Sequence, residues 1–382
     1  MIAGVPRTRI LVVDDDPGIV RAVTRVFGQH YDVRSAAGGA AALAIAAEFD
    51  PDVAIVDIRM PEMNGFELMA RLHAGRPELD VILMTGNAEE PDAHLVQAID
   101  AGAFYFVQKP FERRVLLALV SRCVELRRLR EEKQQTVRRL QQDLEEAQQF
   151  QASLLPPDQM QLRGLSLCAR RVACNALAGD FYDYVAAGDD GAAVVIADVV
   201  GHGTSAAMMT GIVKAAFHAA HVDNFEPLAV VERVKDGIRS FDPGRFITLC
   251  CARFELGSRR LVYASAGHPP LIVRRHKADP VVLDSTGPLI SSALLDIPCE
   301  SATLELDEHD CLLFYTDGVI EAAGPQGSFG QDRVVSLLAD SGHRGPQLLD
   351  RVLSAVDEFS AGREVQDDIT LLAAEYLPHG RG

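Results

Sequence analysis

Acidic, hydroxyl and ammonium side chains follow four short apolar runs in the first third of the chain. Two acids follow the first run, and single residues follow the others: Asp14, Asp15, Asp57, Thr85 and Lys109. Three acids at one point repel one another unless a divalent cation lies among them, and oxygen ligands favour Mg²⁺. Asp57 could then accept a phosphoryl group as a nucleophile, while Lys109 neutralises the developing charge and Thr85 donates a hydrogen bond.

Helix capping is the simpler interpretation of acids at such places. Asp14, Asp15 and Asp16 precede a helical pattern that opens at Pro17, and aspartate is a favoured N-cap residue. One acid would be weak evidence for a site. Five suitable residues at strand ends favour the phosphoryl site, and capping is then the simpler role for Asp16, the extra acid.

A second set of acids is spread over the C-terminal half. The four motifs are Ala178-Gly179-Asp180, Ala197-Asp198-Val199, Thr316-Asp317-Gly318 and Asp367-Asp368. Aspartate beside glycine is also ordinary turn chemistry, and for any single motif that alternative is equally good. Four acids at strand ends of one domain suggest a shared site for two divalent cations. Cations bridged by one carboxylate lie roughly 3.5–4 Å apart and hold a hydroxide that attacks a phosphate.

The elements that must position the first set form a repeating pattern. The predicted strands are 10–13, 33–35, 53–56, 81–84 and 104–107, and helical patterns open near Pro17, Gly38, Gly65 and Ala93 and after Pro110. Apolar strands that are each followed by a helix predict a five-stranded, doubly wound parallel α/β domain. Because the carboxyl ends of parallel strands share one edge, the five residues should converge there.

A glycine-free stretch rich in Arg, Glu and Gln follows this domain. Its apolar residues form a heptad seam, interrupted by Arg130, Lys133 and Gln151; the seam consists of Leu119, Cys123, Leu126, Val137, Leu140, Leu144 and Leu154. The pattern fits either a solvated helix of one chain or a parallel coiled coil between two chains. We favour a coiled-coil linker over 123–156 and a homodimer, because a lone helix would expose the seam to water.

Beyond Pro157 the apolar pattern becomes strand-like again. We predict strands over 194–200, 247–254, 261–265, 271–274 and 311–316, and helices over 204–222, 227–240, 333–340 and 346–359. This arrangement predicts one α/β domain over 157–378, with sheet packed on sheet and helices outside.

Composition excludes several classes of function. The 54 acidic against 37 basic residues give a net charge of -17, which disfavours nucleic acid and anionic membranes as partners. The chain has no apolar run of about 20 residues, and its start lacks the apolar core of a signal peptide. Its seven cysteines form no C-x-x-C pair, so we expect reduced thiols and a cytoplasmic location. No cysteine has an arginine six residues later, unlike in cysteine-dependent phosphatases.

Residues 7–122 resemble the receiver domains of two-component response regulators. The resemblance implies that Asp57 is the phosphoacceptor, that Asp14 and Asp15 bind Mg²⁺ with it, and that a sensor histidine kinase is the partner. Thr85 and Lys109 match the hydroxyl and lysine of that family. Two further features are implied: Phe106 as the aromatic switch residue, and a cis peptide between Lys109 and Pro110.

Residues from about 150 to 377 resemble the SpoIIE-like branch of type 2C protein phosphatases. The resemblance includes the Gln-Ala-Ser-Leu-Leu-Pro segment at 151–156 and the Ala-Gly-His-Pro-Pro turn at 266–270. It implies that Asp198 is the bridging, catalytic ligand of two Mn²⁺ or Mg²⁺ ions. The other implied ligands are the Val199 carbonyl, Asp180, Asp317 and Asp367, with Asp183, His202 and Asp368 farther out. Ala178 replaces a usual glycine, and 288–291 departs from the family's Pro-Leu-Gly stretch.

Together the two resemblances imply a response regulator in which Asp57 phosphorylation controls a metal-dependent serine/threonine protein phosphatase. The implied substrate is a phosphorylated anti-sigma-factor antagonist in a partner-switching pathway. A non-enzymatic, phosphorylation-dependent adaptor is the alternative, and the complete set of four acids favours the enzyme. A DNA-binding regulator is weaker, because no helix-turn-helix segment follows the receiver and the net charge opposes it.

Overall fold

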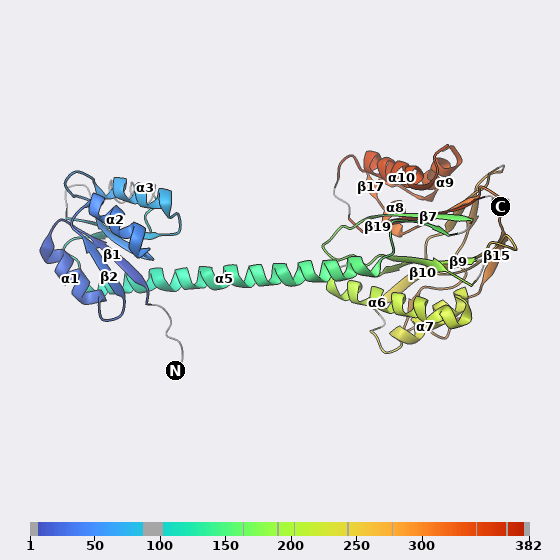
Figure 1. Ribbon diagram of the computed structural model, residues 1–382, viewed down its shortest axis with the longest axis horizontal. Coiled ribbons are helices and arrows are strands. Elements are labelled where there is room, and N and C mark those ends of the chain that lie inside the picture. The colour runs from blue at the N-terminus through green and yellow to red at the C-terminus, as the bar shows by residue number, and fades with distance from the viewer. Residues whose placement is uncertain are drawn as a thin grey trace. The chain divides into compact units, whose positions relative to one another are not determined.

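The structure is a computed structural model (Figure 1) that describes residues 7–86, 102–162, 164–188, 191–201, 203–242, 244–276, 278–340, 342–363 and 366–377. His202 and the helix predicted from Ala93 lie outside the described residues. The chain divides into two compact units, Met1–Leu140 and Gln141–Gly382. In the part of the chain that the structure describes, helices are too short or too polar to cross a membrane.

The first unit contains a five-stranded parallel sheet in the order β2-β1-β3-β4-β5. The strands are β1 (Arg9–Val13), β2 (Asp32–Ala36), β3 (Val53–Asp57), β4 (Asp80–Thr85) and β5 (Tyr105–Gln108). Its helices include α1 (Pro17–Phe27), α2 (Gly39–Phe49) and α3 (Gly65–Gly75). Every residue of β3 and β4 is buried because apolar clusters cover both faces of the sheet. The predicted doubly wound domain is confirmed.

Helix α5 (Arg113–Leu154) follows this sheet and continues into the second unit. Leu116, Val120 and Cys123 are fully buried or nearly so in the core of the first unit. Farther along, Val137 is 54% and Leu140 62% exposed. The long helix is therefore present, and its central apolar residues face solvent.

Three members of the predicted seam have partners within their own unit, which corrects that part of the prediction. Cys123 and Leu119 pack into the core of the first unit, and Leu154 packs into a core of the second. Two of the residues that interrupt the predicted seam also have a place within one chain. Arg130 forms an ion pair with Asp80, and Gln151 is buried. The apolar residues left for pairing with a second chain are those of the central part of α5.

The second unit packs two six-stranded sheets face to face. One has the order β15-β11-β10-β9-β8, with β14 beside β10, and the other has the order β13-β12-β16-β19-β7-β6. The strands of the first sheet are β8 (Phe181–Ala186), β9 (Gly191–Val199), β10 (Phe246–Glu255), β11 (Arg260–Ala266), β14 (Ile290–Ser291) and β15 (Ala302–Glu305). The strands of the second are β6 (Gln159–Leu162), β7 (Leu165–Val172), β12 (Leu271–Arg274), β13 (Val281–Leu283), β16 (Cys311–Tyr315) and β19 (Ile369–Tyr376).

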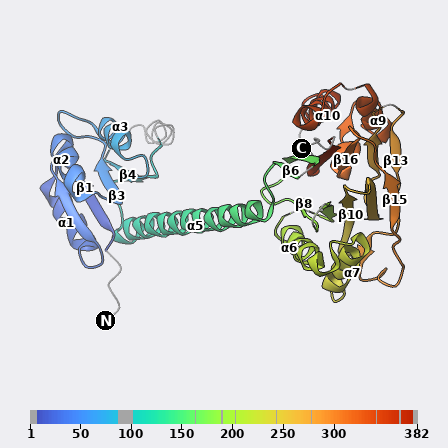
Figure 2. The same ribbon diagram turned by 45° about the vertical axis from the view of Figure 1, so that its right-hand side comes forward.

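Helices cover the outer face of each sheet of the second unit (Figure 2). They are α6 (Thr204–Ala219) and α7 (Pro227–Ile238) on the first sheet, and α9 (Gln331–Asp340) and α10 (Gly345–Ser360) on the second. Shorter elements are η1 (Ala220–Asp223), α8 (Asp317–Ile320), β17 (Ala323–Gly324) and β18 (Gly327–Ser328). A core between the sheets includes Tyr182, Val194 and Leu372. The predicted sandwich with outer helices is confirmed, although strands such as β7, β8 and β19 were not predicted.

Candidate functional site

The first candidate site lies at the carboxyl edge of the parallel sheet. Ligand oxygens of Asp14, Asp15 and Asp57 all lie within 4.8 Å of one another. The ammonium group of Lys109 lies 2.6 Å from Asp14 Oδ2 and 2.6 Å from Asp57 Oδ1. Strands β1, β3 and β5 thus bring together four of the five residues that the sequence selected.

Burial and charge determine the electrostatics of this site. Burial raises the pKa of Asp57, and Asp14 raises it further, while the Lys109 contact opposes both effects. Burial alone would lower the pKa of Lys109, but its contacts with Asp14 and Asp57 leave that pKa raised. Three clustered carboxylates and one ammonium leave a net negative charge, and an all-oxygen donor set suits a hard divalent cation.

The remaining predicted residues of the first unit belong to β4, β5 and the turns after β1 and β5. Thr85 is fully buried at the end of β4, and Phe106 of β5 packs partly buried against the core. The peptide between Lys109 and Pro110 is cis, as the resemblance implied. Asp16 is the N-cap of α1, where its Oδ1 accepts a hydrogen bond from the Gly18 N–H at 2.7 Å, so the capping interpretation is confirmed for this acid.

The second candidate site contains the four predicted acids of the second unit. Asp180 immediately precedes β8, Asp198 lies near the end of β9, Asp317 begins α8, and Asp367 lies just before β19. Asp180 is buried, and its Oδ2 accepts a hydrogen bond from Thr316 Oγ1 at 2.8 Å. Both sheets of the sandwich therefore contribute acids to this site.

The charges of these acids act on one another and shift their pKa values. Burial, followed by the charges of Asp317 and Asp367, raises the pKa of Asp198 to about 7. Burial raises the pKa of Asp317, to which Asp367 and Glu321 also contribute. For Asp180, burial and then Asp198 place the pKa well above its ordinary value. Neighbouring like charges disfavour ionisation of these carboxyl groups, and a bound divalent cation would offset that repulsion, so the acids fit a site for divalent cations.

Cys174, which the sequence did not single out, lies beside two of the acids that it did. Ligand atoms of Cys174, Asp367 and Asp368 lie within 4.8 Å of one another. Both carboxylate oxygens of Asp368 accept backbone hydrogen bonds, from Cys174 N–H at 2.9 Å and from Gly179 N–H at 2.7 Å. Asp368 thus fixes the loop before Asp180.

Asp183 has a different environment from the one implied by the resemblance. Its Oδ2 accepts hydrogen bonds from Lys214 Nζ at 2.9 Å and from His218 Nε2 at 2.8 Å. Both partners belong to α6, so Asp183 joins β8 to that helix. No described contact connects it with the four acids.

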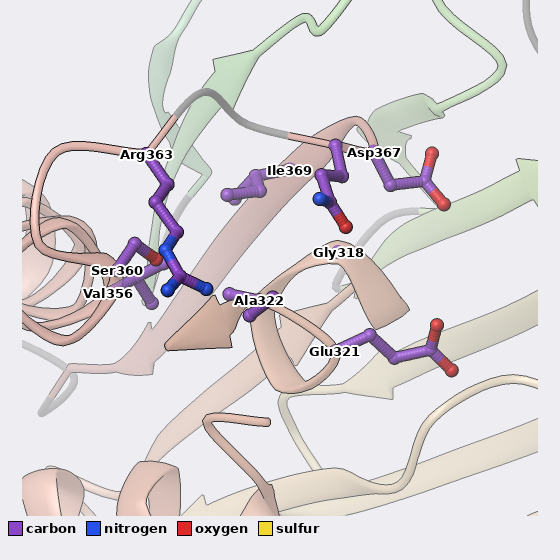
Figure 3. Close-up of a pocket in the computed structure, with 10 residues that line it drawn as sticks. Gly318, Glu321, Ala322, Val356, Ser360, Arg363, Asp367 and Ile369 are labelled. Atoms are coloured by element: carbon purple, nitrogen blue, oxygen red, sulfur yellow. The ribbon is translucent and has the colours of Figure 1, made fainter. Parts of the chain in front are cut away.

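A cavity of about 240 Å³ adjoins the acids (Figure 3). Asp367 and Glu321 line one side, and Arg363, from the segment after α10, lines the other. Among the described residues that line the cavity, Arg363 carries the positive charge. Its guanidinium group forms no ion pair with another described residue. The cavity therefore offers a positive charge close to the acidic site, which the sequence did not indicate.

Comparison with known families agrees with this division of the chain. The family model of the response regulator receiver domain matches residues 10–121, and that of stage II sporulation protein E (SpoIIE) matches residues 188–377. The chain joins a response-regulator receiver domain to a SpoIIE-type phosphatase domain. The SpoIIE match contains Asp198, Asp317 and Asp367, whereas Asp180 precedes it, so the case for Asp180 depends on the structure.

Individual proteins are also similar to parts of this chain. The chain is 36% identical over 143 residues to the regulatory protein AtoC of Escherichia coli, covering 37% of this chain and 30% of AtoC. Protein IcfG of Synechocystis sp. is 26% identical over 263 residues, which cover 60% of this chain and 41% of IcfG. This chain therefore spans less than half of either relative.

The SpoIIE-type domain also has a solved structural neighbour. The SiaA-PP2C domain of Pseudomonas aeruginosa superimposes with a TM-score of 0.55 at 21% identity, covering 63% of this chain and 98% of that one. This similarity shows that the sandwich has the fold of a type 2C phosphatase domain.

Proposed function

We propose that this protein is a response regulator in which phosphorylation of Asp57 controls a metal-dependent serine/threonine protein phosphatase. The observation that supports the proposal is the presence of an acidic cluster in each unit, Asp14, Asp15 and Asp57 at the receiver sheet edge and a cluster that includes Asp367 in the sandwich, where the charges of Asp317 and Asp367 also act on Asp198. A complete acid set favours an enzyme over a non-enzymatic adaptor.

In the receiver, Asp57 Oδ is the nucleophile toward a phosphoryl donor such as a phosphorylated sensor histidine kinase. Asp14, Asp15 and Asp57 would hold Mg²⁺, which supplies charge neutralisation when bound. Lys109 already contacts Asp57 at 2.6 Å, so its ammonium group is placed to bind an oxygen of the phosphoryl group. Thr85 ends the neighbouring strand and would donate a hydrogen bond.

In the phosphatase domain, Asp180, Asp198, Asp317, Asp367 and the Val199 carbonyl would hold two Mn²⁺ or Mg²⁺ ions, with Asp198 as the bridge. Bound cations of this kind supply a nucleophilic hydroxide at neutral pH. The acids fix the geometry, and the buried Asp180 is oriented by Thr316. The substrate would be the phosphoserine form of an anti-sigma-factor antagonist.

Arg363 is the residue placed to bind an anionic group of that substrate. Arg363→Ala should raise the KM for a phosphoserine protein about 10-fold and leave kcat nearly unchanged, because charge-assisted hydrogen bonds to oxyanions contribute ~1.5–3 kcal/mol. Steady-state phosphate release measures both constants. Arg351→Ala is the matched control, since Arg351 pairs with Glu358 on α10 and does not line the cavity. An unchanged KM in Arg363→Ala would remove Arg363 from substrate binding.

A homodimer through the central part of α5 is also proposed. Val137, Leu140 and Leu144 are exposed within one chain and follow the a/d spacing of a coiled coil. Leu140→Glu should therefore convert dimers to monomers at micromolar concentration, as measured by light scattering, without altering the unfolding of either domain. Gln141→Glu adds the same charge beside the seam and should leave the dimer intact. A monomeric wild-type protein would contradict the coiled coil.

A further inference from the structure

Gln151, in the last turn of α5, makes two hydrogen bonds to one residue of the phosphatase domain. Its Nε2 donates to the Ala178 carbonyl at 2.7 Å, and its Oε1 accepts from the Ala178 N–H at 3.1 Å. The Gln151 side chain is buried, with 5% of the residue exposed. One turn earlier, Gln148 Nε2 donates to the Ala176 carbonyl at 2.9 Å. The end of α5 is thus bonded to the loop formed by residues 174–179.

The 174–179 loop leads directly to Asp180 and contacts the elements that hold the other acids. Asp368 binds the loop from its other side, through the N–H groups of Cys174 and Gly179. The Val199 N–H donates to the Gly179 carbonyl at 3.3 Å, next to Asp198. Gln151 and Asp368 therefore both hold the loop, which ends next to Asp180 and is bonded to the residue after Asp198.

Close packing at Gly179 leaves the loop little freedom to shift without moving the site. A Cβ at this position would lie 2.6 Å from the Val199 carbonyl oxygen and 3.0 Å from the Gly201 carbonyl oxygen. The Val199 carbonyl is itself a proposed metal ligand. A displacement of the loop would therefore change the positions of both Asp180 and this carbonyl.

A separate contact fixes the end of the helix. Lys214 Nζ of α6 donates to the Leu154 carbonyl at 2.5 Å and to Asp183 Oδ2 at 2.9 Å. The carbonyl is one of the groups that a helix C-terminus leaves without an intrahelical partner. The last turn of α5 is therefore held on the domain by α6, independently of the loop.

We propose that Gln151 is a positioning residue for the metal-binding acids, acting through its paired hydrogen bonds to Ala178. This inference rests on the proposed function, because it concerns the same metal site. It makes the 174–179 loop the connection through which a change at the end of α5 reaches Asp180. Residues that orient metal ligands from outside typically change metal affinity by 10–100-fold.

Gln151→Met tests the proposal, because methionine keeps the length of the side chain and removes both hydrogen bonds. In the full chain, calorimetric titration with Mn²⁺ should show about 10–100-fold weaker binding. Hydrogen exchange of the metal-free protein should be faster at the Ala178 amide. Saturating Mn²⁺ should restore most of the turnover of a small phosphoester. Gln149→Met, an exposed position on the same turn, is the matched control and should behave as wild type.

Wild-type Mn²⁺ affinity and wild-type Ala178 exchange in Gln151→Met would overturn the inference while leaving the proposed function standing. A wild-type protein that binds no Mn²⁺ and releases no phosphate would instead overturn the proposed function, and the inference with it. If Gln151→Met does not fold, Gln148→Met removes only the neighbouring bond to Ala176. It should then weaken Mn²⁺ binding in the same direction by a smaller factor, and an unchanged affinity would again overturn the inference.

Discussion

Asp198→Asn is expected to abolish phosphate release, lowering kcat by about 1,000-fold or more. Loss of the proposed bridging ligand should remove several kcal/mol of transition-state stabilisation, and each 1.36 kcal/mol is a factor of ten in rate. Asp317 and Asp367, whose charges act on Asp198, are themselves proposed ligands, so we expect neither to take over the bridging position. Activity of wild type in excess EDTA, or of Asp198→Asn at the wild-type rate, would contradict a metal mechanism.

The same substitution should stabilise the metal-free protein at high pH. The pKa of Asp198 is raised from 3.8 to about 7 in the folded chain, so the native state binds this proton more tightly than the unfolded state does. The free energy of unfolding must then fall as pH rises from about 4 to about 7. Asparagine avoids this loss, and urea unfolding at pH 8 in EDTA should show a gain of about 1–4 kcal/mol. A less stable variant under these conditions would contradict the electrostatic account.

Asp57→Asn should eliminate phosphorylation of the receiver and with it the response of phosphate release. Incubation of wild type with acetyl phosphate and Mg²⁺ should add one base-labile phosphoryl group, detected by mass spectrometry, and the variant should add none. Asp16→Asn is the control, because Asp16 caps α1 and should leave labelling intact. A label on another residue of Asp57→Asn would contradict the assignment.

Lys109→Met separates phosphorylation from its consequence. Lys109 contacts both Asp14 and Asp57 at 2.6 Å, so we expect it to be the group that senses a new charge on Asp57. The variant should still accept a phosphoryl group, while its rate of phosphate release no longer changes upon phosphorylation.

The receiver site was predictable because local pattern and topology determine it. Strands β3 and β4 contain uninterrupted apolar runs, at 53–56 and 81–84, and in a parallel sheet their carboxyl ends must share an edge. Asp14, Asp57 and Lys109 were therefore placed together without knowledge of any side-chain contact, and the structure confirms the placement. The role of each residue stays a prediction.

The phosphatase domain was less predictable because distant pairings form it. Strand β19 pairs with β7, about 200 residues earlier, and β7 carries Arg170 and Arg171 in a pattern that does not read as a buried strand. In the sequence, Gln151 is a polar residue that interrupts the heptad seam. Its hydrogen-bond partner, Ala178, lies beside it only in the tertiary structure, so the sequence does not indicate the contact. Cys123 fits the same heptad but is buried in the core of the receiver domain. Periodicity alone does not distinguish a helix face that meets its own domain from one that meets a second chain.

Phosphate release from a phosphoserine-containing antagonist protein, measured with Mn²⁺ before and after treatment with acetyl phosphate, tests the central claim most directly. The account predicts that treatment changes the rate of phosphate release by the wild-type protein and leaves the rate of Asp57→Asn unchanged. Asp198→Asn should release no phosphate before or after treatment. Equal wild-type rates before and after treatment, with mass spectrometry showing Asp57 fully phosphorylated, would contradict control of the phosphatase by the receiver.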